Sequence, residues 1–135
     1  MNDKIHKALG IFLDAMRPFV VSFLQQHFPN EPWEGLFFAR LKPARQTTWN
    51  QAMRAQGENQ SCMYFIDYNN LPDFAIGFKR ELGLEFENLD KANKFISYLQ
   101  ELKDIRNKCN HYQALDNEEI EGAYPVSYTH PSPRD

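Results

Sequence analysis

The chain has 135 residues, of which 42% are hydrophobic and 14% aromatic, and its formal net charge is −3. This length suffices for one domain with a single modest core, and the apolar content excludes an intrinsically disordered chain. The acidic balance argues against a protein that binds nucleic acid over most of its surface, because such surfaces are basic.

Apolar residues at helical spacing predict a first helix over residues 4–27, in which Pro18 should produce a kink or a division into two helices. Charged residues interrupt this apolar segment and no cleavage site follows it, so we expect a soluble protein without a membrane span. A second helix is expected over 33–41. The next helix should begin at Thr47 or Thr48, either of which is a suitable N-cap.

The second half of the chain also shows helical spacing. The stretch CMYFI at 62–66 fits either a helix or a buried strand, and the helical surroundings favour a helix. A stripe over 74–82 predicts a helix that ends at Gly83. The longest pattern runs from about 89 to about 110, and Asp116 with Glu119 resembles a capping box that would start a short helix near 117. The expected fold class is therefore an all-α bundle.

The last ten residues, VSYTHPSPRD, differ from the rest because they are polar and contain two prolines. They suit a disordered tail, and SYTHPSPRD also resembles translated sequencing-adapter text. We therefore expect a helical domain over 1–124 and a non-native or disordered tail over 125–135, and we leave His130 out of the functional argument. The adapter resemblance further predicts that the natural gene continues past about Pro125, so that C-terminal domains are missing from this chain.

The two cysteines, Cys62 and Cys109, stand in no metal-ligand spacing and are too few for a secreted disulfide scaffold. We therefore predict no metal site, no cofactor and a cytoplasmic location.

The stretch DIRNKCNHYQ at 104–113 is the one place where the residue types suit a reaction. RNA can be cleaved without a metal if a histidine moves the 2′-OH proton and a fixed arginine stabilises the charge on the phosphorane. An amide nearby can orient the substrate. Arg106, Asn107 and His111 supply these three groups and are the candidate catalytic residues.

The spacing of these residues is weak support by itself. On an ideal helix Arg106 and His111 lie about 140° apart, whereas Asn107 and His111 share a face. A common site would need the helix to loosen near Asn110, the arginine to swing across, or a second chain to complete the site. An ordinary polar helix end, with Arg106 as a structural cation and His111 near the helix dipole, fits the same residues.

The segment LKDIRNKCNHYQ at the end of an amphipathic helix resembles the signature of HEPN domains, an all-helical family. The family's motif is an arginine, a polar residue and, a few residues later, a histidine. The start, ALGIFLDAMRPFV, resembles a HEPN subgroup found appended to PIN-type nucleases and to prokaryotic defence and ATPase proteins. The resemblance covers roughly residues 5–123, and the middle, 30–85, matches in helical character alone.

The resemblance implies a metal-independent endoribonuclease that acts on RNA as a homodimer, with the arginine and histidine of both protomers facing one cleft. It also implies a role in a toxin or phage-defence system, where an antitoxin is a possible partner. The alternative that the family offers is a non-catalytic dimerisation or RNA-sensing module at the N-terminus of a larger protein.

Overall fold

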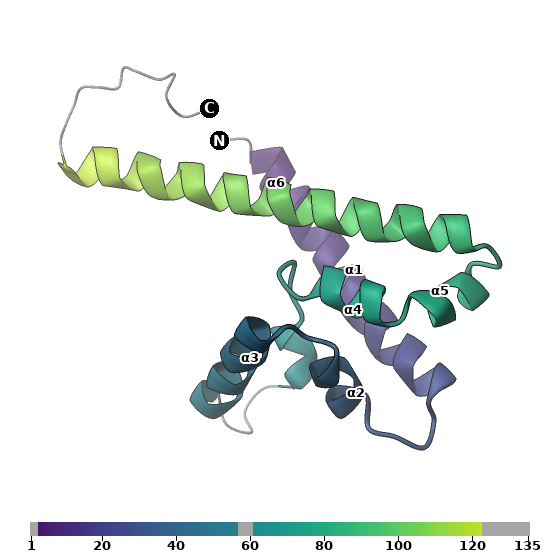
Figure 1. Ribbon diagram of the computed structural model, residues 1–135. Coiled ribbons are helices and arrows are strands. Elements are labelled where there is room, and N and C mark those ends of the chain that lie inside the picture. The colour runs from purple at the N-terminus through teal and green to yellow at the C-terminus, as the bar shows by residue number, and fades with distance from the viewer. Residues whose placement is uncertain (1–2, 57–60, 123–135) are drawn as a thin grey trace.

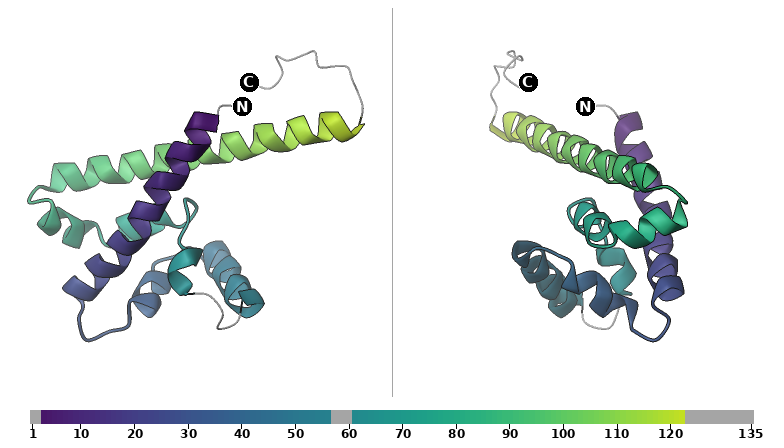
Figure 2. Two further views of the ribbon diagram at one scale, coloured as in Figure 1. Left: turned by 180° about the vertical axis from the view of Figure 1, so that it is seen from behind. Right: turned by 45° about the vertical axis from the view of Figure 1, so that its right-hand side comes forward.

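The computed structural model describes residues 3–56 and 61–122, which form an all-α bundle as expected (Figure 1). In chain order the elements are α1 (Asp3–His27), α2 (Trp33–Ala39), α3 (Pro43–Gln56), the 3₁₀ turn η1 (Cys62–Phe65), α4 (Leu71–Gly77), α5 (Lys79–Glu85) and α6 (Leu89–Gly122). The long helices α1 and α6 cross, and α6 packs on α5, α4 and α1 (Figures 1 and 2). Of the segment 62–66, residues 62–65 are thus helical, as predicted, but as a single 3₁₀ turn that ends before the extended Ile66.

Aromatic rings fill the centre of the bundle. The Phe74 ring lies 5.7 Å from that of Phe23 in α1 and 5.9 Å from that of Phe37 in α2. The Phe37 ring in turn lies 5.3 Å from Trp49 in α3. Each such side chain contributes roughly 1.5–3 kcal/mol when fully buried, so this cluster ties four helices together.

Helix α1 continues through Pro18 as a single helix, so the predicted division into two is wrong. Pro18 lies on the exposed face, while Met16 and Val20 are buried on the opposite face and hold the two turns together. Length and composition alone would allow α1 to cross a membrane. In the structure, the buried face of α1, which includes Leu9, Met16 and Val20, packs into the core.

Helix α3 begins at Pro43, earlier than the threonine N-cap predicted. Proline suits the first helical position because its missing N–H would have no partner there. The Thr47 and Thr48 hydroxyls instead donate back to the carbonyls of Pro43 and Ala44, at 3.2 Å each. This i−4 bond satisfies a threonine inside a helix, so an N-cap role is not needed.

The predicted helix over 74–82 is two short helices, and Gly83 lies inside α5 and does not end it. The break occurs at Phe78, whose φ of −115° and ψ of 28° leave the helical region while its ring is buried. A Cβ on Gly83 would lie 3.3 Å from a methyl of Leu89, so the glycine permits the start of α6 to approach α5 closely. Tertiary packing therefore determined both the break at Phe78 and the place of Gly83 inside α5.

Helix α6 runs without interruption from Leu89 to Gly122, so a helix end near Asn110 and a separate helix near 117 were both wrong. The reason is local: no proline or glycine occurs between 89 and 121, and a capping pattern inside a helix-forming stretch does not start a new helix. The predicted tail, 125–135, lies outside the described residues.

Candidate functional site

Helix α6 holds all three candidate residues, at 106, 107 and 111. The helix is regular across this stretch, so loosening near Asn110 does not bring Arg106 and His111 together. Arg106 is half-buried, whereas Asn107 and His111 are exposed. Of the three ways to form a common site, a swing of the arginine side chain and a second protomer remain.

The Arg106 side chain is anchored rather than free in solvent. Its Nε donates to Oδ1 of Asn107 at 3.3 Å, and its guanidinium carbon lies 5.8 Å from the centre of the Tyr68 ring. A cation over an aromatic face is stabilised by about 0.5–2 kcal/mol, depending on how dry the contact is. The structure therefore joins Arg106 to Asn107 directly and to the loop before α4 through Tyr68.

A hydrogen bond and a ring contact, both to α1, fix the position of Tyr68. Its hydroxyl donates to the Leu9 carbonyl of α1 at 2.6 Å, and its ring stacks on Phe12 at 6.3 Å between centres. Burial raises the pKa of the Tyr68 hydroxyl above its ordinary value, and the positive charge of Arg106 acts in the opposite direction. Tyr68 thus stays neutral at physiological pH and connects α1 to the arginine.

The stretch around Tyr68 is held by reciprocal side-chain bonds. Oδ1 of Asp67 accepts from the backbone N–H groups of Asn69 and Asn70, at 2.9 and 3.3 Å. Oδ1 of Asn70 accepts from the N–H of Asp67 at 2.9 Å, and its Nδ2 donates to the Phe65 carbonyl at 3.3 Å. These bonds satisfy the polar atoms of a tight turn, so the turn presents Tyr68 in one orientation.

The two flanks of α6 differ in character. One flank forms an apolar groove with α1, lined by Phe12, Tyr98, Leu102 and Ile105 among others. At about 100° per residue, Asn107 lies about 160° and His111 about 120° around the helix from Ile105. Asn107 and His111 therefore face away from this groove. The C-terminal part of α6 also extends past the bundle on the side where α3 lies, in every view (Figures 1 and 2).

Within residues 3–56 and 61–122, no group of three or more His, Cys, Asp or Glu side chains is placed to hold a metal ion. Tyr68 was not among the candidate residues that the sequence indicated. The available signal was local: Asp67, Asn69, Asn70 and Pro72 surround the single aromatic residue of a turn.

An all-α bundle whose longest helix contains an arginine, an asparagine and a histidine at this spacing has the features of a HEPN domain. The family described as Swt1-like HEPN matches residues 7–125, and the chain belongs to this family. Comparison with curated proteins and with solved structures gave no match.

Proposed function

We propose that this protein is an endoribonuclease that cleaves RNA by internal transesterification. His111 accepts the 2′-OH proton as the 2′-oxygen attacks the adjacent phosphorus, and the bond to the 5′-oxygen breaks as that oxygen takes up a proton. Arg106 stabilises the charge on the phosphorane, and Asn107 orients the substrate. The products have a 2′,3′-cyclic phosphate and a 5′-hydroxyl.

The observation that carries this proposal is the anchoring of Arg106. A cation held in place on Tyr68 and bonded to Asn107 needs little reorganisation when charge develops beside it, which is what electrostatic catalysis requires. The exposed His111, one turn beyond Asn107, is accessible to a substrate strand.

A second protomer completes the site in this proposal, because one straight helix places Arg106 and His111 about 140° apart. The sharpest test mixes Arg106→Ala protein with His111→Ala protein. If the arginine and histidine of one site come from different protomers, mixed dimers regain one intact site, and about a quarter of the wild-type activity returns. If both come from one chain, mixing restores nothing.

The activity itself is tested by incubating the purified protein with total RNA in excess EDTA and mapping the ends of the fragments. Wild type should cut, whereas Arg106→Ala and His111→Ala should not. Lys94→Ala is the matched control, since it removes a cation from an exposed position about 18 Å earlier along the same helix. No cut by wild type, or a cut that survives both motif substitutions, contradicts the proposal.

A second candidate is a non-catalytic dimerisation or RNA-sensing module of a larger protein. The net charge of −3 favours it, because a surface that grips RNA is usually basic. The contacts of Arg106 fit both candidates, since a guanidinium stacked on Tyr68 and bonded to Asn107 can also be a purely structural cation. Under this hypothesis His111→Ala leaves folding and dimerisation unchanged and there is no RNA cleavage to lose.

The setting we propose is the cytoplasm, in a toxin or phage-defence system with an antitoxin or additional C-terminal domains as regulators. The HEPN class supports this setting.

A further inference from the structure

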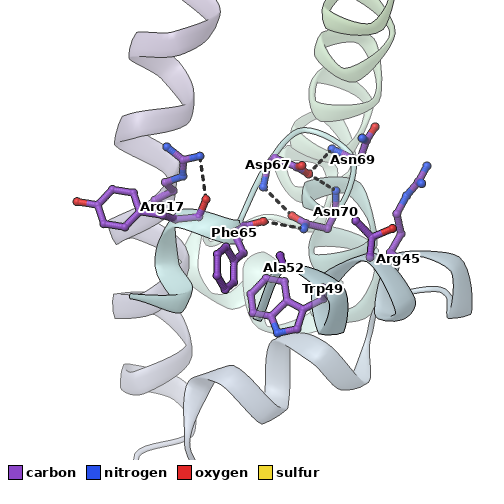
Figure 3. A pocket seen from close by; sticks show the side chains of 10 residues that line it. Arg17, Arg45, Trp49, Ala52, Phe65, Asp67, Asn69 and Asn70 are labelled. Carbon is purple, nitrogen blue, oxygen red and sulfur yellow. Dashed lines mark hydrogen bonds between the residues drawn. The ribbon is translucent and has the colours of Figure 1, made fainter. Parts of the chain in front are cut away.

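A pocket of about 320 Å³ lies between α3, the segment 64–70 and α1 (Figure 3). This volume is at the low end of the range of about 300–1,000 Å³ found for small-molecule sites, which suits a ligand of nucleotide size. Its walls combine aromatic rings with charged and amide groups: Arg17, Arg45, Thr48, Trp49, Ala52, Tyr64, Phe65, Asp67, Asn69 and Asn70.

The two arginines of the pocket differ in how many hydrogen bonds and ion pairs their guanidinium groups already make. Arg17 donates to the carbonyls of Ile66 and Tyr64, at 3.0 and 3.2 Å, and its Nη1 donates to the Asp14 carboxylate at 3.2 Å. In the described part of the chain, by contrast, the Arg45 guanidinium makes no hydrogen bond or ion pair. Arg17 is therefore part of the wall, and Arg45 is the cation available to an anionic group.

The position of Arg45 is unfavourable for the helix that contains it. It lies in the first turn of α3, where the helix dipole disfavours a positive charge, and no acidic residue of α3 shares that turn. An anionic ligand would remove this penalty. Figure 3 shows Arg45 and Asn69 at one edge of the pocket and Arg17 at the other.

Two further groups of the pocket suit the base of a nucleotide. The side-chain amide of Asn69 has no bonded partner among the described residues, and Asp67 uses only Oδ1 in the turn. An amide and a carboxylate oxygen can together bond the edge of a base.

The pocket connects to the candidate catalytic residues through one short stretch of chain. Asp67 and Asn69 line the pocket, and Tyr68 between them supports the Arg106 guanidinium. Asn107 and His111 face away from the apolar groove that Phe12 lines beside α6. A strand bound in the pocket would contact Asp67 and Asn69, the two neighbours of the tyrosine that supports Arg106.

We propose that this pocket is a subsite for one nucleotide of single-stranded RNA, beside the phosphodiester that the motif cleaves. Arg45 binds a phosphate of that nucleotide, and Asn69 with Asp67 bonds the edge of its base. The assignment rests on the proposed ribonuclease function, but it is tested by binding and not by cleavage.

The test measures the affinity of the wild-type chain for a fluorescent 2′-O-methyl RNA octamer, which cannot be cleaved by its own 2′-oxygen. Arg45→Ala should weaken binding about tenfold, the loss expected for one charge-assisted hydrogen bond. Arg54→Ala is the matched control, because it removes the same charge from an exposed position of the same helix outside the pocket. It should change affinity about twofold or less, as a remote phosphate contact would.

A second pair of variants tests whether the RNA occupies the pocket, by reducing the pocket's volume. Ala52→Leu fills part of it and should also weaken binding about tenfold, whereas Ala55→Leu places the same side chain on the exposed face of α3 and should have no effect. Circular dichroism verifies that all four variants are folded. Equal effects of Arg45→Ala and Arg54→Ala, or no binding of the octamer by wild type, would overturn the subsite.

Two further outcomes separate an RNA subsite from a free-nucleotide site, and the subsite proposal from the ribonuclease proposal. If 5′-AMP or 5′-UMP binds as tightly as the octamer, the pocket is a free-nucleotide site and the RNA subsite is rejected. If octamer binding depends on Arg45 and Ala52 while the EDTA assay shows no cleavage, the subsite stands and the ribonuclease proposal fails.

Discussion

Replacing Tyr68 tests whether the anchoring of Arg106 matters for catalysis or only for folding. Tyr68→Phe removes the hydroxyl that donates to Leu9 at 2.6 Å but keeps the ring beneath the guanidinium. Losing one such hydrogen bond should lower the free energy of unfolding by about 0.5–1.5 kcal/mol. Because the ring remains, the rate of RNA cleavage should stay within about twofold of wild type.

Tyr68→Leu removes the ring as well, together with its stacking on Phe12 and the cation–π contact with Arg106. The combined loss of stability should be roughly 2–4 kcal/mol. If the ring holds Arg106 in its reactive orientation by about 1–2 kcal/mol, cleavage should fall about 5- to 30-fold.

Urea denaturation measures the stability of both variants, and initial cleavage rates are compared at a temperature where circular dichroism shows both to be folded. Equal cleavage by the Phe and Leu variants would refute the argument, because it would mean that the Tyr68 ring does not position Arg106.

Three further predictions concern single groups. Gly10→Ala should raise the free energy of unfolding by about 0.5–1 kcal/mol, because Gly10 is inside α1 and a Cβ there meets nothing within 4 Å; urea titration measures this. Iodoacetamide should alkylate Cys62 more slowly than a free thiol at pH 8, since burial and then the Glu34 charge raise its pKa above 9.0. Because burial raises the pKa of Tyr68 in the folded state above its ordinary value of 10.0, this residue's contribution to stability should be constant at pH values well below 10.0 and be lost as the pH rises above 10.0. Tyr68→Phe should reduce that loss.

Much of the fold followed from local pattern. The spacing of Leu9, Met16 and Val20 indicated one buried face of α1, and these residues are buried. The pattern from Leu89 likewise indicated the longest helix and placed Arg106 and Asn107 on it, whereas His111 fell just past its predicted end. Periodicity succeeds here because a helix with one apolar face has few other ways to remove that face from water.

The positions of helix ends were harder to predict because tertiary contacts overrode the local signals. Gly83 looked like a helix end but serves the approach of Leu89 to α5, and the real break occurs at Phe78, where a buried ring sets the backbone. At α6 the failure was local: the absence of proline and glycine outweighed a capping pattern at Asp116.

The sequence by itself determined the all-α class, the family motif and the three candidate residues, because residue type and helical spacing are local properties. Only the tertiary structure decided what surrounds Arg106. Tyr68 is 38 positions earlier in the chain, and no periodicity relates the two. The fold brings them together because α1, the turn 67–70 and α6 bury that tyrosine between them, and the same packing forms the pocket beside Arg45.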